Sequence, residues 1–338
     1  MPLTGRRLDI LRIIVEDYIG AATPIASKAI ADKYGLKASP ATIRNDMAYL
    51  EQEGYVTRPH ISAGSVPTDK AYHYYVDSIN EDVALSQAEQ RIICQLLQEA
   101  KEEIEQWLRL AAAVLARFVR NTAMVTLPIA GQCRFKHLDL VALHDFMALL
   151  ILVLYGARIK QQVLSFDRQV SQDELTRSAN KISRMYAGMT HSEILAMKPE
   201  LSIEEKRMSE CSIGMMAAED RLKYGKAYLE GLHFMLSQPE FARSPRIPDI
   251  LQVLDKEDWL GNIPCPGPSV MTVRVIIGEE NPEEGLRDLS LAISSYGVPG
   301  KVSGMVGVLG PKRMDYVRTI SLLNYFAKLL SSTVGEYV

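Results

Sequence analysis

Cysteine is scarce in this sequence, and the four cysteines stand far apart. Cys94, Cys133, Cys211 and Cys265 form no C-x-x-C pair, and no pair of histidines lies near any of them. Zinc sites and redox dithiols take ligands that lie a few residues apart on at least one side, so the sequence predicts neither kind of site. Free thiols packed in the cores of a cytosolic protein fit this spacing better.

Long hydrophobic segments are missing too. The longest charge-free apolar run, Phe146–Ala157, is well short of the ~20 residues that a membrane-spanning helix needs. Arg6, Arg7 and Asp9 stand close to the N-terminus with no apolar stretch behind them, so we expect no targeting segment. With 338 residues, 47% of them hydrophobic and 23% charged, the composition predicts a soluble, cytoplasmic protein of two or three domains.

The chain has no excess of positive charge, although such an excess marks many nucleic-acid-binding proteins. Its formal net charge is -3, and its first eighty residues hold nine lysines and arginines against nine acidic residues. DNA binding by this segment would therefore depend on where its charges lie on the surface, not on their sum.

No catalytic or phosphate-binding constellation emerges from the motifs. The glycines between positions 300 and 310 fit neither a P-loop nor a dinucleotide-binding loop, and His144–Asp145 lacks a nucleophile in a recognisable turn. The acidic residues of 279–284 lack the spacing of a calcium loop. Lys312 and Arg313 could hold an anion, but a solvated helix start is the simpler interpretation. We predict neither an enzyme nor a cofactor or metal site.

The first part of the chain has the pattern of a helix-turn-helix. Apolar residues at helical spacing predict a helix over 5–19 that ends at Gly20. A second, shorter helix follows. Either Thr23 or Ser27 could be its N-cap, and Gly35 suits its C-terminal end.

The third helix carries the prediction of DNA reading. Ser39 can cap it and Pro40 suits its first position, and the helix runs on to Gly54. Its buried stripe comprises Ile43, Met47 and Leu50. The opposite face is small and free of acids, and it comprises Ala41, Asn45 and Ala48, with Arg44 on the flank. Arginine and asparagine bond guanine and adenine edges in the major groove, respectively, so this face predicts base reading.

Beyond Gly54 the hydrophobic pattern changes to a period of two. Two extended runs around Ser62-Ala63-Gly64-Ser65 predict a β-hairpin wing, on which Arg58 and His60 could meet phosphates. A protein-interaction module without DNA contact shares this architecture, so that alternative stays open. The full set of predicted DNA contacts is Ser39, Ala41, Thr42, Arg44, Asn45, Ala48, Arg58, His60, Ser62 and Gly64.

Residues in a fixed order over about forty positions give this region a resemblance. It resembles the N-terminal region of HrcA repressors in Ala41-Thr42-Ile43-Arg44-Asn45-Asp46-Met47, Pro59-His60, Ser62-Ala63-Gly64 and Pro67-Thr68-Asp69-Lys70. Ser65 and His73 depart from the family, which usually has arginine at both positions. If each lost cation were a phosphate contact, the salt dependence of DNA binding would weaken by about one unit apiece.

The rest of the chain predicts helices followed by a mixed sheet. A capping box at Ser86 opens a helical stretch that reaches Arg120, either as one helix or as two. Strand patterns occupy 124–165 and return over 270–309, around a different middle segment. That arrangement predicts one sheet domain with an insertion, on which the Met-, Tyr- and Leu-rich tract Met215–Glu240 would be available for association.

The predicted fold class is a multidomain α+β protein with an N-terminal winged helix-turn-helix. The C-terminal motifs Ile276-Ile277-Gly278-Glu279-Glu280-Asn281 and Gly307–Tyr316 also resemble HrcA repressors, which implies a GAF-like mixed α/β domain with a smaller inserted domain. The expected boundaries are 1–80 for the winged helix, 81–121 for a helical linker, 122–197 plus 263–338 for the GAF-like domain and 198–262 for an inserted dimerisation domain.

The resemblance implies a homodimeric repressor of heat-shock chaperone genes that binds an inverted-repeat operator in double-stranded DNA. It further implies that chaperonin maintains the active fold and that heat relieves repression by occupying the chaperonin. Two other functions fit the same sequence. One is a small-molecule-sensing regulator that acts through the GAF-like domain, and the other is a scaffold whose winged helix no longer binds DNA.

Overall fold

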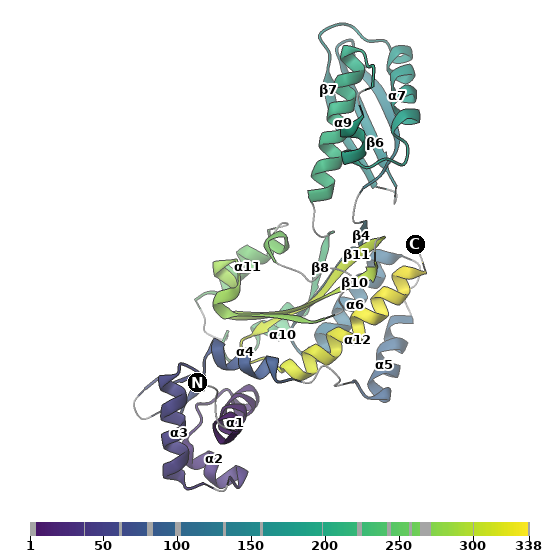
Figure 1. Cartoon of the computed structure of the whole chain (residues 1–338). Helices are drawn as coiled ribbons and strands as arrows, with labels where there is room; N and C mark the ends of the chain where they lie inside the picture. Colours follow the sequence, from purple (N-terminus) through teal and green to yellow (C-terminus); the bar gives the residue numbers. More distant parts are fainter. Residues whose placement is uncertain are drawn as a thin grey trace. The chain divides into compact units, whose positions relative to one another are not determined.

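The computed structural model describes residues 5–36, 38–60, 63–79, 84–98, 103–130, 133–155, 158–197, 199–221, 225–241, 245–256, 259–263, 272–299 and 301–336. The chain forms two compact units (Figure 1). The first comprises residues 1–128, 224–299 and 303–338, and the second comprises residues 129–223 with 300–302. No helix within the described ranges is both long and apolar enough to cross a membrane.

The N-terminal part of the first unit is a winged helix-turn-helix, as predicted. Its elements are α1 (Gly5–Ala21), α2 (Ser27–Tyr34), α3 (Pro40–Gln52), β1 (Val56–Thr57), β2 (Val66–Pro67) and α4 (Asp69–Asp77). The two wing strands pair antiparallel, with Val56 opposite Pro67. The helices enclose a small core of fully buried side chains that includes Ile10, Ile14, Ile30, Ile43 and Leu50.

Local sequence signals predicted most of these helix ends correctly, but not all of them. Gly35 ends α2 in the left-handed conformation, with φ 56°, as expected of a C-terminal glycine. The N-cap of α2 is Ala26, which makes no side-chain cap, so the prediction of Thr23 or Ser27 was wrong. Helix α1 continues through Gly20 to Ala21. Ile25 explains the unexpected start of α2, because its backbone is held in a bridge to Ser65 of the wing.

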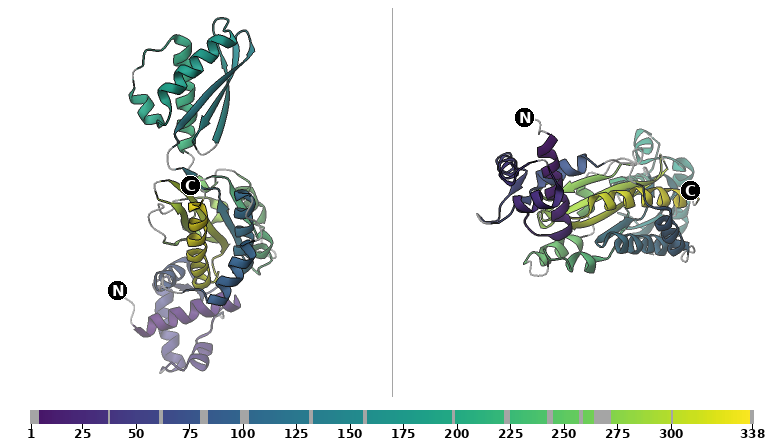
Figure 2. Two further views of the ribbon diagram at one scale, coloured as in Figure 1. Left: turned by 90° about the vertical axis from the view of Figure 1, so that its right-hand side faces the viewer. Right: turned by 90° about the horizontal axis from the view of Figure 1, so that it is seen from below.

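Five strands of a six-stranded sheet form the centre of the first unit. Its strands are β3 (Thr122–Thr126), β8 (Ala227–Glu230), β9 (Arg274–Ile277), β10 (Leu289–Val298) and β11 (Val302–Pro311), and they lie in the order β8-β3-β11-β10-β9. Helices α6 (Ile104–Val119) and α12 (Tyr316–Gly335) cover one face (Figure 2). The other face packs against α10 (Leu232–Leu236) and α11 (Ile247–Leu254) in an apolar core.

The helical stretch after the winged helix is two helices. They are α5 (Gln87–Leu97), which opens with the predicted capping box at Ser86, and α6, and residues 99–102 between them lie outside the described ranges. The indole N–H of Trp107 on α6 donates to the Leu97 carbonyl oxygen over 3.2 Å, which ties the two helices together. The predicted helical stretch is therefore two helices, and α6 packs against both α5 and α12.

The second unit is a three-stranded antiparallel meander with helices on one face. Strands β5 (Phe135–His144), β6 (Met147–Leu154) and β7 (Arg158–Ser165) pair in the order β5-β6-β7. Helices α7 (Gln172–Tyr186), α8 (His191–Ala196) and α9 (Ile203–Arg221) share a core with the inner face of this sheet. The two-residue strand β4 (Ile129–Ala130) precedes it.

The outer face of this three-stranded sheet is apolar and exposed. Val141, Leu149 and Val163 lie opposite one another across the three strands, and Val153 lies opposite Ile159. Val141 is 45% exposed, Val163 47% and Ile159 59%. Asp139, Ile151 and Gln161 lie between these two apolar rows on the same face. Exposed apolar surface of this extent is common at interfaces, so the face has the character of one.

The boundaries of the insertion differ from the prediction. Strands β5–β7 were assigned to the main sheet and 198–262 to the insertion, whereas the compact inserted unit is 129–223. The reason lies in β8, a short strand near the end of the supposed insertion, which pairs with β3 in the main sheet. The tract Met215–Glu240 accordingly forms no single association surface, because Met216 is buried in the core of the second unit and Met235 in that of the first.

Candidate DNA-binding site

Helix α3 has the local chemistry of a recognition helix. Ser39 caps it by accepting the backbone N–H of Thr42 at 3.2 Å, and Pro40 occupies its first turn, as the sequence predicted. The hydroxyls of Ser39 and Thr42 lie 3.0 Å apart. The first N–H groups of a helix favour anions, so these two hydroxyls stand where a phosphate would be bound.

The outward face of α3 is the one that the sequence predicted. Ile43, Met47 and Leu50 are buried, and the residues predicted to read bases are exposed: Ala41, Arg44, Asn45 and Ala48. The two alanines keep this face narrow, whereas Arg44 and Asn45 project two different hydrogen-bonding groups from it. A helix with such a face can enter a major groove and distinguish base pairs there.

Asp46 is the functional residue on α3 that the sequence analysis missed. Its carboxylate accepts from Nε of Arg6 at 2.7 Å and from Nε of Arg7 at 3.1 Å, and its side chain is only 5% exposed. Burial acts to raise the pKa of Asp46, but the hydrogen bonds and charges of the two arginines outweigh it, and the pKa is lowered. The Arg7 guanidinium also stacks 3.6 Å from the centre of the Tyr49 ring.

This cluster removes a negative charge from the reading surface. Asp46 faces α1, so its carboxylate is neutralised on the side of α3 that is turned away from the exposed face. A pair of basic residues near the N-terminus was visible in the sequence, but nothing local connected it with an acid forty residues further along the chain.

The wing residues differ in what they can offer to DNA. His60 is exposed, whereas Arg58 is half-buried and pairs with Glu51 of α3 at 3.1 Å. Gly64 has a structural reason for being glycine, because a Cβ there would lie 2.5 Å from the backbone carbon of Ile25. Ser62 lies outside the described residues. A phosphate contact by Arg58 would have to compete with Glu51.

The two departures from the family pattern both lie away from the reading surface. Ser65 is fully buried, and its backbone exchanges two hydrogen bonds with Ile25. His73 lies on α4 with its Nε2 3.2 Å from a carboxylate oxygen of Glu280, in the sheet domain. Neither side chain is placed where an exposed phosphate contact would be made. The weaker salt dependence expected from these two positions therefore has no support in the geometry.

Two described cations on the surface of the winged helix, Lys28 and Arg44, have no partner among the described residues. Among the described lysines and arginines between positions 5 and 79, all except Lys28 and Arg44 make an ion pair or a hydrogen bond to an acid or a carbonyl oxygen. Lys28 is exposed in the first turn of α2. The first helix of a helix-turn-helix crosses the DNA backbone, so Lys28 joins the candidate contacts although the sequence analysis did not select it.

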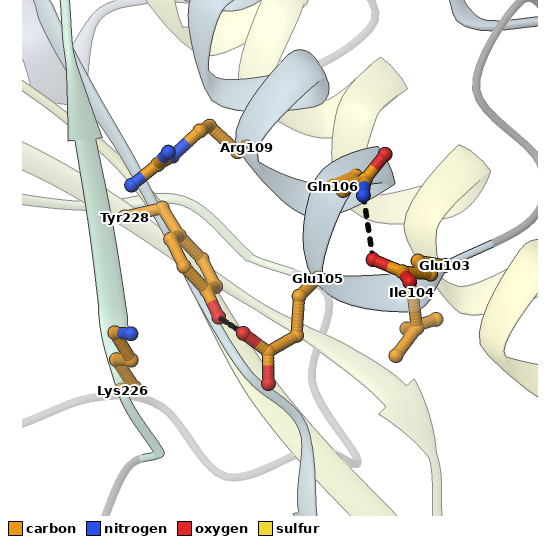
Figure 3. Close-up of a pocket in the computed structure, with 7 residues that line it drawn as sticks. All are labelled: Glu103, Ile104, Glu105, Gln106, Arg109, Lys226 and Tyr228. Carbon is orange, nitrogen blue, oxygen red and sulfur yellow. Dashed lines mark hydrogen bonds between the residues drawn. The ribbon is translucent and has the colours of Figure 1, made fainter.

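A cavity of about 590 Å³ lies elsewhere in the first unit, between α6 and the edge strand β8 (Figure 3). Glu105 accepts a hydrogen bond from the Tyr228 hydroxyl at 2.7 Å, and Arg109 and Lys226 flank the same ring. Ligand cavities are predominantly apolar, and this one is lined mainly by charged groups. Across the described ranges, no three His, Cys, Asp or Glu side chains are grouped closely enough to hold a metal ion.

Two family descriptions match the chain. One, a winged helix-turn-helix transcription repressor described as HrcA DNA-binding, covers residues 2–80, and the other, the HrcA protein C-terminal domain, covers residues 105–320. The first agrees with the segment that contains α1 to α4. The second spans all of α6 except its first residue, the strands of the main sheet and the whole inserted unit.

Curated relatives are similar over almost the full length. The chain is 41% identical over 334 residues to the heat-inducible transcription repressor HrcA of Dehalococcoides mccartyi strain 195, with 99% of this chain and 96% of the relative covered. It is 38% identical over 352 residues to the protein of the same name from Chloroflexus aggregans, with 99% and 94% covered. The crystal structure of a hypothetical protein shares the fold, with a TM-score of 0.62, 18% identity and both chains fully covered.

Proposed function

Since this chain belongs to the HrcA family of heat-inducible transcription repressors, we propose that it represses chaperone genes by binding an inverted-repeat operator as a homodimer. Each protomer would insert α3 into the major groove of one half-site, and the two-fold symmetry of the protein would match that of the operator. The curated relatives are transcription repressors, and this protein would act on DNA in the cytoplasm.

The face of α3 that carries Arg44 and Asn45 is the observation on which this proposal depends. Arg44 is exposed and unpaired among the described residues, so its guanidinium is available to bond O6 and N7 of a guanine. Asn45 would bond an adenine in the same way, and Ala41 and Ala48 would contact thymine methyl groups. Ser39 and Thr42 would bond a phosphate at the helix start, while Lys28, His60 and the wing tip would contact the backbone on either side.

Charge placement supports DNA binding by a segment with no net charge. Asp46 and Glu51 are both neutralised by arginines, and Asp17 is neutralised by Lys33 over 2.7 Å. Of the acids in this segment, Asp17, Asp46 and Glu51 are paired in this way, whereas Asp9, Asp32 and Asp77 are exposed. Among the described cations, Lys28 and Arg44 are exposed without a partner. The outward face of α3 would thus present one free cation, Arg44, although the charges of the first eighty residues sum to zero.

The exposed apolar face of the β5-β6-β7 sheet supports the homodimer. A second copy of the same face would bury Val141, Ile159 and Val163 of both protomers in an isologous contact. Between its two apolar rows the face carries Asp139, which lies 3.3 Å from His137, and no lysine or arginine. Chaperonin would maintain the active fold, and heat would relieve repression by occupying it, as the family resemblance implies.

Fluorescence anisotropy tests the proposal directly. Purified protein is titrated against the inverted-repeat duplex and a scrambled duplex, in a series of salt concentrations, with and without chaperonin. We expect salt-sensitive binding that prefers the repeat by at least ~10³, the low end for specific DNA readers. Equal, weak binding to both duplexes in the presence of chaperonin would contradict the proposal and leave the sensor and scaffold alternatives.

A further inference from the structure

We propose that the ion pair between Asp69 and Lys312 is a positioning device that fixes the winged helix on the sheet domain of the first unit, so that the repressor presents its recognition helices to both half-sites in a preset orientation. The inference rests on the proposed function, because orientation matters most to a dimer that must engage two half-sites at once. Asp69 and Lys312 are positioning residues and make no DNA contact themselves.

Asp69 is held from two directions. Its carboxylate oxygens lie 2.9 and 3.0 Å from Nζ of Lys312, which follows β11, and one of them accepts the backbone N–H of Glu279, after β9, at 3.3 Å. Both side chains are about one-third exposed, at 30% for Asp69 and 29% for Lys312. An acid in the first turn of α4 also interacts favourably with the helix dipole.

Gly278 makes the close approach possible. It adopts φ +57°, and a Cβ on it would lie 1.9 Å from Oδ2 of Asp69 and 2.6 Å from Nζ of Lys312. A side chain at this position would therefore occupy the space in which the ion pair forms. Three motifs that the sequence analysis noted separately, at Thr68–Lys70, Ile276–Asn281 and Gly307–Tyr316, meet at this one point.

Two further contacts flank the ion pair on the same side of α4. Arg313 donates to the Ile19 carbonyl oxygen at the end of α1 over 3.2 Å, and Glu240 holds the same guanidinium in a salt bridge. The rings of Tyr72 and Tyr316 pack with their centres 5.9 Å apart, and both are almost fully buried. Because the contacts come from α1 and from two positions on α4, they restrict rotation of the winged helix against the sheet domain. A single contact would leave that rotation free.

The connection reaches the recognition helix through one residue. Thr68, directly before Asp69, donates its hydroxyl to the carbonyl oxygens of Gly54 and Tyr55 at 2.8 and 2.9 Å, just beyond the end of α3. The ion pair thus fixes the segment on which α3 ends. A preset orientation raises the effective concentration of the second head at the second half-site, and so favours the full operator without changing the affinity of either head alone.

The test uses the full-length variants Asp69→Asn and Lys312→Met and the double variant. The matched controls are Asp77→Asn on α4 and Lys328→Met on α12, the helix that follows Lys312. Asp77 and Lys328 are exposed. Affinities are measured for the full operator, for a single half-site, and for an operator with two base pairs inserted between the half-sites. The insertion rotates one half-site by roughly 70°, because B-DNA turns once in about 10.5 base pairs.

We expect Asp69→Asn and Lys312→Met to weaken full-operator binding by about three- to tenfold, with the half-site affinity unchanged and the penalty for the insertion reduced. The double variant should bind the full operator no more weakly than the weaker-binding single variant, because each substitution breaks the same ion pair. The controls should behave like the unaltered protein. Variants that keep the original full-operator affinity and insertion penalty overturn the proposal.

Hydrogen exchange without DNA separates this proposal from the proposed function. Loss of the pair should speed exchange in 69–79 and 274–280, while the central amides of α3 stay as protected as in the unaltered protein. Unchanged exchange in both segments overturns the positioning role, whether or not the operator is bound. Failure of the unaltered protein to prefer the operator contradicts the proposed function, and the exchange result then decides the positioning role by itself.

Discussion

Arg44 and Asp46 lie two positions apart on α3 and point to opposite sides of it. The Arg44 side chain is exposed and unpaired among the described residues, whereas the Asp46 carboxylate is buried against α1 between Arg6 and Arg7. Two positions correspond to 200° around a helix, so the separation follows from helical geometry. The consequence is electrostatic, because the one acid in the middle of α3 is neutralised on the inner side and the cation faces outward.

Arg44→Ala should remove discrimination at one base pair of the operator. A bidentate contact to guanine contributes about 1–3 kcal/mol, so binding to the native operator should weaken by that amount and the preference at one position should be lost. Anisotropy titrations against operators substituted at each position measure both effects. Arg12→Ala is the control, since Arg12 lies on α1 and pairs with Glu16 at 2.8 Å. An Arg44→Ala protein with unchanged specificity would favour the scaffold alternative.

Lys28→Ala should weaken binding to every DNA sequence alike. A phosphate contact carries no sequence information, and its loss should reduce the dependence of log K on log salt by about one unit. The measurement is the slope of that plot for the operator and for the scrambled duplex. Equal slopes for Lys28→Ala and the unaltered protein would show that Lys28 meets no phosphate.

Asp46→Asn should destabilise the winged helix by ~2 kcal/mol at neutral pH, because a buried carboxylate loses its charge-assisted hydrogen bonds. The pKa of Asp46 is lowered from 3.8 in the folded protein, so its stabilising effect is complete well above pH 3.8 and disappears as the pH falls through the lowered value. The difference in unfolding free energy between the two proteins should therefore shrink between pH 6 and pH 3. Chemical denaturation at several pH values measures it, with exposed Asp9→Asn as the control. A difference that is independent of pH would contradict this account.

Gly64→Ala should destabilise the wing by about 1–3 kcal/mol, because the added methyl group meets the Ile25 backbone, which cannot yield as a flexible side chain would. Thermal unfolding of the full chain measures the loss. Gly20→Ala is the matched control. Its Cβ meets nothing within 4 Å on a helix, so it should be neutral or slightly stabilising. If both variants unfold alike, the close approach of Gly64 and Ile25 does not contribute to stability.

Val163→Lys should convert the proposed homodimer into a monomer. Val163 lies on the edge strand β7, 47% exposed and opposite Leu149, so a lysine there would place a charge in the apolar row that Val141, Leu149 and Val163 form. Sedimentation equilibrium measures the mass in solution. Leu195→Lys, on α8 of the same unit and 62% exposed, is a control of similar chemistry away from the sheet. A Val163→Lys protein that stays dimeric would place the interface elsewhere.

The sequence was most informative where structure is set by neighbours in the chain. Ser39, Pro40 and the spacing of Ile43, Met47 and Leu50 predicted the start of α3 and its buried stripe, because caps and helical periodicity act within a few residues. Strands β6 and β7 lie inside the predicted strand region 124–165, where apolar and β-branched residues dominate. The assignment of the second domain as GAF-like and the set of DNA contacts remain predictions.

Tertiary structure decided the features that depend on contacts across long stretches of chain. The pairing of Asp46 with Arg6 and Arg7, the approach of Gly64 to Ile25 and the ion pair between Asp69 and Lys312 join residues 39 to 243 positions apart. Nothing in local propensity encodes such a partner, because a carboxylate has the same sequence neighbours whether it faces solvent or an arginine. The insertion boundaries were missed for the same reason. Strand β8 is too short to stand out in the sequence, and only its hydrogen bonds to β3 make it part of the main sheet.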